Sequence, residues 1–517
     1  MAEPFVLIVG AGPTGMTAAI ELRRLGLDVR IVDRSDHLAI HSQALALQAR
    51  TLEQFQRYGI AAEAVARGRK VTDAAIFSEG KQIVSASLSG ISSVYPYILM
   101  LPQSHTEAIL NRKMESFGTR TERGTQLESI DQHKGTITAV LRHPAGGREE
   151  LEPRWVIGCD GAHSTVREKL GIPFEGGGIG LSFFLGDLQM DGPGVPGDEV
   201  SLHFHHGDVI FMARLTEKLV RVVAATHAMQ DGAMRKDVAI EDFQKVFQSA
   251  GIEATIHSAE WMTPFNVNDR QARHYRLGNV FLAGDASHIH SPVGGQGMNT
   301  GIQDAANLAW KIAAVARGAG DALLDSYEEE RGEVGRALLR FTERGLKMAT
   351  ATNPVIETLR DKMLPLFSTL HPAQKRILGF ISETAISYRS SSIVSDFGGD
   401  GYLSAGDRLP DLGLRKGGLN YTLLHDWTEP KHLALLLDPT AAEVAEIKAA
   451  LPLTTVVTLS YRDLLQEGLR ALGPDRKLLI VRPDGYIGFR GQVEPRTPWT
   501  EYAEQDAILT TSKVAFQ

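Results

Sequence analysis

The sequence predicts a mixed α/β fold with a parallel sheet, an inserted antiparallel sheet and a small C-terminal α/β domain. Three segments carry this prediction, because each reads as a short apolar strand that runs into glycine and then into a helix. These segments are 5–26, 155–168 and 279–311. A chain of 517 residues is also long enough for about three domains.

The composition is that of an ordinary soluble globular protein, with 43% hydrophobic and 22% charged residues. The formal net charge is -8 and basic residues form only short clusters, which argues against nucleic acid or an anionic membrane as a partner. The single cysteine, Cys159, excludes an intrachain disulfide and a thiolate metal cluster. The apolar start is too short and too rich in glycine for a membrane span, and it lacks signal-peptide features. We therefore expect a cytoplasmic protein.

The first segment places a glycine-rich turn, GAGPTG, between a strand over Phe5 to Val9 and a helix that ends near Gly26. A second strand, Val29 to Val32, leads into Asp33 at about the 20-residue spacing expected for an acid that binds a ribose. Glycines let the backbone approach a pyrophosphate, whose charge the helix N-terminus stabilises. We predict a Rossmann-like nucleotide site; the alternative is a tight turn without a ligand. Its residues are Gly10, Gly12, Pro13, Thr14, Gly15 and Asp33.

The other two segments each end a strand in a carboxylate beside glycine, at Asp160-Gly161 and at Gly284-Asp285. An ionised aspartate accepts hydrogen bonds from hydroxyls, so such a strand suits a polyol chain. The glycine run GGGIG at 176–180 follows no β-branched strand and opens no clear helix. The chain therefore has one Rossmann-type site, and the two carboxylates favour a flavin over a nicotinamide as its occupant.

These residues resemble the class A flavoprotein monooxygenases, the aromatic hydroxylases related to p-hydroxybenzoate hydroxylase. The three motifs occur in that family's order, and PVGGQGMN resembles its flavin-contacting loop. The resemblance continues through TLEQFQRYGI, LPQSHTEAIL and DAANLAWKI to AGDRLPD and LLIVRPDGYIGF, so it covers nearly the whole chain. The C-terminal part resembles the thioredoxin-like domain of the phenol, pentachlorophenol and polyketide hydroxylase branch. The resemblance implies FAD as the cofactor.

The loop before residue 298 is expected at a helix N-terminus, because Ile302, Ala305 and Ala309 recur at helical spacing. Reduced flavin carries negative charge at its N1/O2 end, which free backbone N–H groups stabilise. The resemblance places Gly297, Met298 and Asn299 at that end, and Gly284 and Asp285 at the ribityl chain. It places Pro292, Gly294 and Gly295 beside the face where oxygen and the aromatic ring meet.

The histidine pair His288 and His290 could suggest a metal. Two histidines supply at most two of the three or four protein ligands usual for zinc. We therefore predict no metal and expect both histidines to fix the loop through hydrogen bonds.

Further cofactor contacts follow from the resemblance. Asp33 and Arg34 would bind the adenosine ribose and its surroundings, and Gln103 the pyrophosphate or flavin side. Arg50 is a further contact, with a solvated helix-surface arginine as the alternative. Asp160 would handle FAD and NAD(P)H, with a helix N-cap as the alternative. Many relatives have arginine where this chain has Gln43, so we expect a different binding mode for the reductant or a different flavin mobility.

The domains are expected at 1–175 with 277–395 for FAD, at 176–276 with about 71–101 for the substrate sheet, and at 396–517 for the thioredoxin-like part. Alternating stretches such as EVSLHFHHGDVIFMARL predict antiparallel strands. His203 and His205 share one strand face and could accept a phenol proton, with surface or partly buried strand histidines as the alternative. Phe211 and Phe265 are candidates for the pocket wall, with core packing as the alternative.

The C-terminal domain contains no cysteine and cannot perform dithiol chemistry, so we expect a structural role, at a homodimer interface.

The resemblance implies an FAD-dependent monooxygenase. NAD(P)H would reduce FAD, O2 would add at C4a to give a hydroperoxide, and a phenolic or polycyclic aromatic ring would be hydroxylated. The cofactor carries the difficult chemistry, while the protein positions it and excludes water. The alternatives are an FAD oxidase, dehydrogenase or halogenase, and a non-enzymatic flavin-binding redox protein. An ordinary NAD dehydrogenase would leave the two carboxylate motifs without a purpose.

Overall fold

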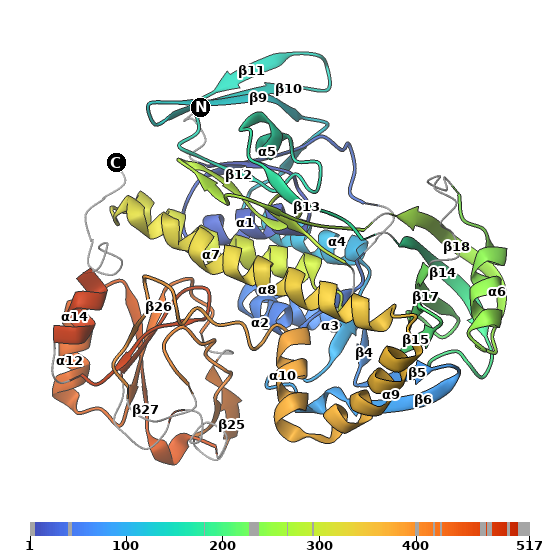
Figure 1. Ribbon diagram of the computed structural model, residues 1–517. Helices are drawn as coiled ribbons and strands as arrows, with labels where there is room; N and C mark the ends of the chain where they lie inside the picture. The colour runs from blue at the N-terminus through green and yellow to red at the C-terminus, as the bar shows by residue number, and fades with distance from the viewer. Residues whose placement is uncertain are drawn as a thin grey trace.

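The computed structural model describes residues 6–39, 44–179, 181–226, 237–265, 267–291, 294–398, 403–416, 419–423, 427–465, 472, 478–493 and 497–504. Figure 1 shows three β-rich parts joined by the long helices α7 (Gly297–Ala316) and α8 (Asp325–Ala349). Among the described residues, no helix is long and apolar enough to cross a membrane.

The central sheet has the strand order β20-β21-β12-β1-β2-β8, and all neighbours are parallel except β20 and β21. Strands β1 and β12 are buried throughout, as expected for a parallel sheet covered on both faces. The three predicted strand and helix pairs are confirmed. The strands are β1 (Val6–Val9), β2 (Val29–Asp33), β8 (Thr121–Arg123), β12 (Trp155–Gly158), β20 (Arg276–Leu277) and β21 (Val280–Leu282).

Helices α1 (Pro13–Arg24) and α5 (Thr165–Lys169) contact strands of the central sheet. Helix α1 packs against α4 (Gln103–Glu115) and against α7. Helix α5 also contacts a separate three-stranded sheet, which lies at the top of Figure 1. That sheet consists of β9 (Gln126–His133), β10 (Thr136–Arg142) and β11 (Arg148–Leu151).

The second large sheet has the order β18-β14-β17-β16-β15-β5-β6, and only β15 and β5 pair in parallel. The predicted antiparallel strands are confirmed, and the segment near 71–101 contributes two strands. Helix α6 (Ile240–Ser249) covers one face, and Leu346 of α8 packs on the other. The strands are β5 (Asp73–Ser78), β6 (Lys81–Ser87), β14 (Ser182–Asp191), β15 (Glu199–His205), β16 (Asp208–Arg214), β17 (Leu219–Thr226) and β18 (Thr255–Phe265).

Two further small sheets have the strand orders β3-β7-β4 and β13-β19-β22. The run GGGIG falls largely within the first strand of the order β13-β19-β22, so it opens no helix, as expected. The strands are β3 (Ala46–Leu47), β4 (Arg69–Val71), β7 (Ile98–Met100), β13 (Phe174–Gly178), β19 (Asn268–Ala272) and β22 (His288–Ile289). The remaining helices here are α2 (Ala49–Tyr58), α3 (Ala61–Arg67), α9 (Pro354–Thr369) and α10 (His371–Ile381), with the short turns η1 (Leu88–Gly90), η2 (Gly284–Ala286) and η3 (Asp321–Leu324).

The C-terminal part forms a five-stranded sheet of order β23-β29-β28-β26-β27. Strands β26 and β27 are parallel and joined by α12, whose N-terminus is closed by a capping box between Thr440 and Glu443. An antiparallel pair, β28 and β29, completes the sheet. The elements are β23 (Ser395–Asp396), β24 (Gly413–Lys416), β25 (Leu419–Thr422), β26 (His432–Leu437), α12 (Ala441–Ala450), β27 (Thr454–Leu459), η4 (Tyr461–Asp463), β28 (Leu478–Val481), β29 (Ile487–Gly491) and α14 (Thr497–Glu504).

A buried charge network, which we call the seam, joins this C-terminal sheet to α7 and α8. Glu330 accepts hydrogen bonds from Arg482 at 2.6 Å, Lys311 at 2.8 Å and Asn307 at 2.6 Å. Asp484 pairs with Arg482 as well, so two carboxylates face two cations. All five side chains are buried. Burial alone would raise the pKa of Glu330. The positive charges of Arg482 and Lys311 outweigh this effect and hold that pKa well below its usual range.

Candidate active site

The first and second glycine motifs meet at the carboxyl ends of β1 and β12. A side chain at Gly10 would overlap the carbonyl oxygen of Cys159, and Gly10 has a left-handed φ of 101°. A side chain at Gly15 would overlap the carbonyl oxygen of Gly10. These two glycines are therefore required by backbone packing within the protein itself.

Gly12 differs from both neighbours in the motif. A Cβ atom built there would meet nothing within 4 Å, and Gly12 keeps some exposed surface between buried residues. It is the N-cap of α1, whose first backbone N–H groups have no partner within the helix. The open side of the loop thus lies at Gly12, where a pyrophosphate could approach.

The third glycine motif meets the first at Thr14. A Cβ atom at Gly284 would lie 2.6 Å from the Thr14 hydroxyl oxygen, and one at Gly301 would overlap the same atom. The turn η2, the start of α1 and the first turns of α7 therefore pack without room for further side chains. All three glycine motifs converge on one edge of the central sheet.

Two carboxylates border this edge. Asp33 accepts hydrogen bonds from the backbone N–H groups of Ala11 at 2.6 Å and Ser35 at 2.8 Å, which holds its side chain against the glycine turn. Asp285 is exposed, although Gly284 and Ala286 on either side of it are buried. Asp285 is therefore accessible to a ligand, although the surrounding protein desolvates its carboxyl group and raises its pKa. Arg34, next to Asp33, is exposed as well.

The N-terminus of α7 is fixed to the glycine loop by Asn299. Its Nδ2 donates to the carbonyls of Ala46 at 2.8 Å and Gly295 at 2.9 Å, while its Oδ1 accepts from the backbone N–H of Gln48. Gln48 in turn donates to the carbonyl of Gly294. The Asn299 side chain therefore makes its hydrogen bonds to the protein backbone. The donors that remain for a ligand are the backbone N–H groups of Gly297 to Asn299.

The histidines of the third motif have different partners. His288 is buried and donates from Nε2 to Asp304 at 2.8 Å; Asp304 also accepts from Arg331 at 2.6 Å. Burial raises the pKa of Asp304, but Arg331 and His288 lower it by more, to about 2. His290 bonds the carbonyl of Ser291 instead. In the described part of the chain, neither histidine belongs to a group with metal-ligand spacing; the one such group is Glu79, His205 and His206, at the end of β15 and the adjacent turns.

A buried acid, Glu383, lies against the same helix. It accepts hydrogen bonds from Thr300 and Gln303 of α7, and burial raises its pKa to about 8 in spite of these donors. The folded protein therefore holds this proton more tightly than the unfolded chain. The resulting stability is complete below the ordinary glutamate pKa of about 4.3 and is lost as the pH rises through about 8.

We expect Glu383→Gln to remove this pH dependence. Urea unfolding of the wild type should lose up to about 1.4 kcal/mol of stability per pH unit between about pH 5 and 8, while the variant should lose less. At each pH, subtracting the free energy of unfolding of the variant from that of the wild type removes the contribution of all other titrating groups. Parallel profiles over pH 5–9 would show that Glu383 does not titrate in this way.

The second sheet places His203 and His205 away from the central sheet. In the β15 and β16 pairing, His203 lies opposite Ile210 and therefore on its face, which is the face that packs against α6. Burial lowers the pKa of His203 to about 4, and its ring stacks on Phe77 at 4.4 Å. His205 pairs with Glu79 at 2.7 Å. This placement argues against the predicted roles in substrate binding and proton transfer and favours the alternative of strand histidines.

Phe211 and Phe265 lie on the opposite face. Phe211 is opposite Leu202 and packs beside Ala46 and Met100, which belong to the strands next to the glycine loop. Phe265 packs on Phe183, with ring centroids 5.4 Å apart. Both rings are partly buried, so they remain candidates for the pocket wall.

The other predicted contacts divide in the same way. Arg50 is buried, so it is not a solvated helix-surface arginine. It donates to Glu53 and to the carbonyl of Asp484, which joins α2 to the C-terminal sheet. These contacts occupy the guanidinium and argue against a contact with the cofactor. Asp160 accepts from the backbone N–H of Val166 and from the hydroxyl of Ser164, but Ser164, not Asp160, is the N-cap of α5. Gln103 opens α4 and donates to Glu107. Gln43 and Pro292 lie outside the described residues.

Sequence reasoning missed Gln48 and the pair Asp304 and Arg331. The available signal was an aspartate among the alanines of α7, a position where a buried charge needs a partner. The partner Arg331 lies on α8 and also donates to Tyr388 at 2.8 Å. Its identity depends on helix packing and could not be read from the sequence.

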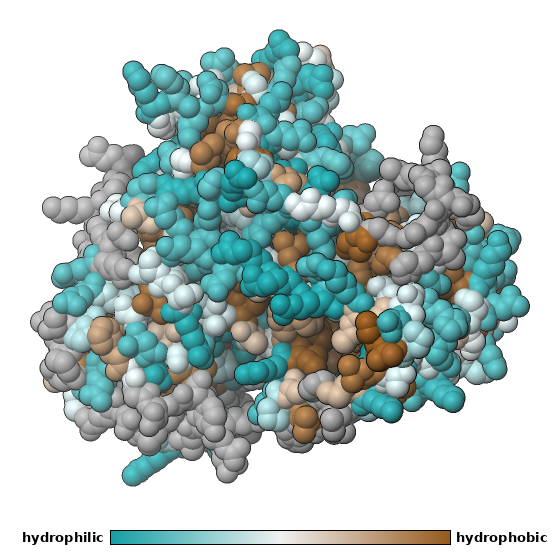
Figure 2. All heavy atoms as spheres, viewed as in Figure 1, coloured by the Kyte–Doolittle hydropathy of each residue, from teal (hydrophilic) through white to brown (hydrophobic). Residues whose placement is uncertain are grey.

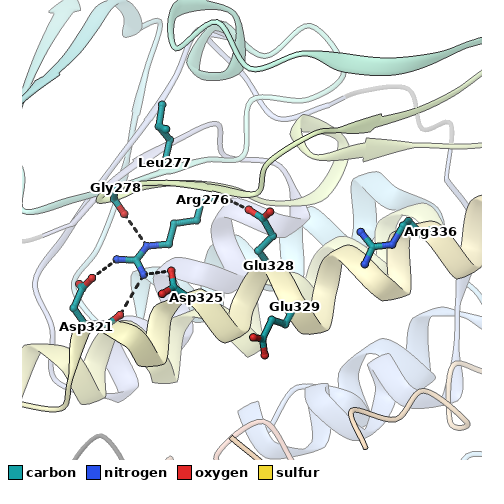
Figure 3. Close-up of a pocket in the computed structure, with 8 residues that line it drawn as sticks. All are labelled: Arg276, Leu277, Gly278, Asp321, Asp325, Glu328, Glu329 and Arg336. Atoms are coloured by element: carbon teal, nitrogen blue, oxygen red, sulfur yellow. Dashed lines mark hydrogen bonds and ion pairs between the residues drawn. The ribbon is translucent and has the colours of Figure 1, made fainter. Parts of the chain in front are cut away.

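A hollow on the surface lies away from this edge, between β20 and α8 (Figure 3). Arg276 pairs there with Asp321 and Asp325 and donates to the carbonyl of Gly278. Glu328 accepts from the backbone N–H groups of Tyr275 and Arg276. These charges satisfy one another, so the hollow is accounted for by packing between β20 and α8.

Comparison with known proteins identifies the class. Residues 3–342 match the family described as FAD binding domain. The chain is 33% identical to 6-methylpretetramide 4-monooxygenase of Streptomyces rimosus, over 96% of this chain and 92% of that protein. It is 35% identical to pentachlorophenol 4-monooxygenase of Sphingobium chlorophenolicum, over 94% and 86%. The OxyS anhydrotetracycline hydroxylase structure from Streptomyces rimosus has a TM-score of 0.80 at 29% identity, covering 97% of this chain and 98% of that one.

The chain therefore belongs to the FAD-binding-domain family and, within it, to the FAD-dependent aromatic monooxygenases. The predicted resemblance is confirmed. The residues fit the cofactor: Gly12 leaves open space at the N-terminus of α1, and Asp285 is accessible to a ligand. Near the N-terminus of α7, Gln48 Oε1, Gln296 Oε1 and His290 Nε2 are buried and have no hydrogen-bond partner among the described residues.

Proposed function

We propose that this protein is an NAD(P)H-dependent FAD monooxygenase that uses O2 to hydroxylate a phenolic or polycyclic aromatic substrate. The observation that carries the proposal is the convergence of three glycine motifs and the α7 N-terminus at one sheet edge, beside the second sheet. The relatives named above act on pretetramide, chlorophenol and tetracycline compounds, which supports an aromatic substrate for this chain.

The backbone does most of the proposed cofactor binding. The turn from Gly10 to Gly15 and the N-terminus of α1 would hold the pyrophosphate. Asp33 and Arg34 would hold the adenosine ribose, and Asp285 the ribityl hydroxyls. The N–H groups of Gly297 to Asn299 would face the end where negative charge develops. When bound, FAD supplies the redox chemistry that these side chains lack.

The substrate would bind between the glycine loop and the face of the second sheet that carries Phe211 and Phe265. The apolar side chains of this face would exclude water from the ring. Figure 2 shows apolar side chains around a hollow at its lower centre, where α9 and α10 lie in Figure 1. The exposed apolar residues of α9 and α10 include Val355, Ile356, Leu359 and Ile377. We propose this hollow as the approach for an aromatic substrate.

The proposed domains are residues 1–175 with 277–395, residues 176–276 with about 71–101, and residues 396–517. The parallel pair β26 and β27 joined by α12, followed by an antiparallel pair, supports a thioredoxin-like C-terminal domain. Since no cysteine lies beyond Cys159, this domain would be structural. We expect it to contribute to a homodimer interface.

The test is aerobic oxidation of NADH and NADPH by the FAD-loaded protein across a panel of phenols and polycyclic aromatics, with 18O2 as the oxygen source. The expected result is substrate-stimulated oxidation and a product that carries one 18O atom. Stimulation that yields only hydrogen peroxide with every compound would indicate an oxidase. No stimulation by any compound, or no FAD binding, would overturn the proposed function.

A further inference from the structure

His290 follows β22, and its protonation state follows from its partner. Nδ1 lies 2.8 Å from the carbonyl oxygen of Ser291. A carbonyl oxygen only accepts hydrogen bonds, so Nδ1 carries the proton. Burial, together with the nearby His288, lowers the pKa of His290 to about 4. The ring is therefore neutral near pH 7, and its Nε2 atom presents a lone pair.

This lone pair has no donor within the described protein. The Nε2 atom is inaccessible to solvent and has no hydrogen-bond partner. It points to the first residue of α7, because it lies 3.6 Å from the position that a Cβ atom of Gly297 would occupy. An unpaired buried acceptor costs about 1–3 kcal/mol, which a bound donor would recover. His288 does not offer its Nε2 in this way, because that atom donates to Asp304.

The surroundings show what kind of ligand would supply the donor. Gln296 uses its Nε2 on the carbonyl of Phe380, and Gln48 uses its Nε2 on the carbonyl of Gly294. Their Oε1 atoms are left buried without donors, as His290 Nε2 is. The α7 N-terminus contributes N–H donors to the same place. A matching ligand edge must therefore carry both acceptors and a donor.

We propose that His290 Nε2 accepts a hydrogen bond from the N3–H group of the flavin ring. The pyrimidine edge of oxidised flavin carries this single N–H between two carbonyl oxygens, so it offers one donor to His290 Nε2 and two acceptors to the N–H groups of α7. His290 would thereby fix the ring relative to the N-terminus of α7. This inference rests on the proposed placement of FAD at that helix end.

The test compares binding of FAD and of N3-methyl-FAD by the full-length apoprotein, measured by flavin fluorescence. His290→Leu removes the acceptor, His290→Gln offers an oxygen in its place, and His257→Leu is the control because His257 is exposed on β18. We expect His290→Leu to bind FAD about 3- to 10-fold more weakly. Methylation of N3 should weaken binding to the wild type but add little to the loss in His290→Leu, and His290→Gln should lie between them.

The contrary outcomes are distinct. If all variants bind FAD equally, and methylation affects all equally, His290 is not the partner of N3–H. If FAD binding is unchanged but His290→Leu alters the visible absorbance of 4-nitrophenol bound to the loaded protein, the donor is a substrate hydroxyl and the assignment to flavin is overturned. If the wild type binds no FAD, the proposed function fails before this inference is reached.

Discussion

Gly12→Ala is expected to fold as the wild type does but to bind FAD at least about 10-fold more weakly. The added methyl group meets nothing in the protein, yet it fills the space above the α1 N-terminus where the pyrophosphate must approach. Loss of one charge-assisted hydrogen bond costs about 1.5–3 kcal/mol, which corresponds to about 10- to 150-fold in affinity. The measurement is FAD titration by fluorescence, with thermal unfolding of the apoprotein alongside.

Gly10→Ala provides the matched comparison within the same motif. Its methyl group would overlap the Cys159 carbonyl oxygen, and φ there is left-handed, so we expect a loss of apoprotein stability as well as of FAD binding. Equal apoprotein stability for the two variants, or unchanged FAD affinity in Gly12→Ala, would contradict the assignment of Gly12 to the open side of the loop.

Glu330→Ala is expected to lower the free energy of unfolding by about 3–5 kcal/mol, because it leaves Arg482 and Lys311 buried with fewer counter-charges. The control is Glu329→Ala, the adjacent and exposed position on α8, whose carboxylate accepts hydrogen bonds from Ser392. We expect the control to change stability by less than about 1 kcal/mol. Urea unfolding at pH 7 measures both values.

The seam also predicts how the free energy of unfolding changes as the pH falls. Because the folded-state pKa of Glu330 lies below its unfolded value, its stabilisation is present above about pH 4.3 and is lost as the pH falls. The wild type should therefore lose more stability between pH 5 and 3 than Glu330→Gln. A loss in Glu330→Ala no larger than in Glu329→Ala would show that the seam does not hold the C-terminal sheet in place.

Local patterns in the sequence were enough to predict the strands and helices that build the cofactor edge. The strands before Gly10, Asp160 and Gly284 are short apolar runs, and each is followed by a glycine-bearing turn that is recognisable from the local sequence. The glycine loop at the N-terminus of α7 followed from the helical spacing of small residues. The alternation in β15 and β16 likewise predicted antiparallel strands, because side chains alternate between the two faces of a strand.

The same alternation showed that His203 and His205 share a face but not which face it is. Only the packing of α6 against Ile210 and Met212 decides that these histidines point away from the glycine loop. Arg50 shows a similar limit, since its helix was predicted but its burial against Asp484 required the C-terminal sheet to dock on α2.

The sequence by itself thus determined the class of this protein, a flavin-dependent monooxygenase, and the backbone elements that mark its cofactor edge. Those elements depend on local geometry, such as a strand, a glycine turn and a helix N-terminus in order. The tertiary structure alone decided the partners of the charged and polar side chains. His288 meets Asp304, and Glu330 meets Arg482, a residue more than 150 positions away. Because such pairs form between elements that only packing brings together, their chemistry becomes visible only in the folded chain.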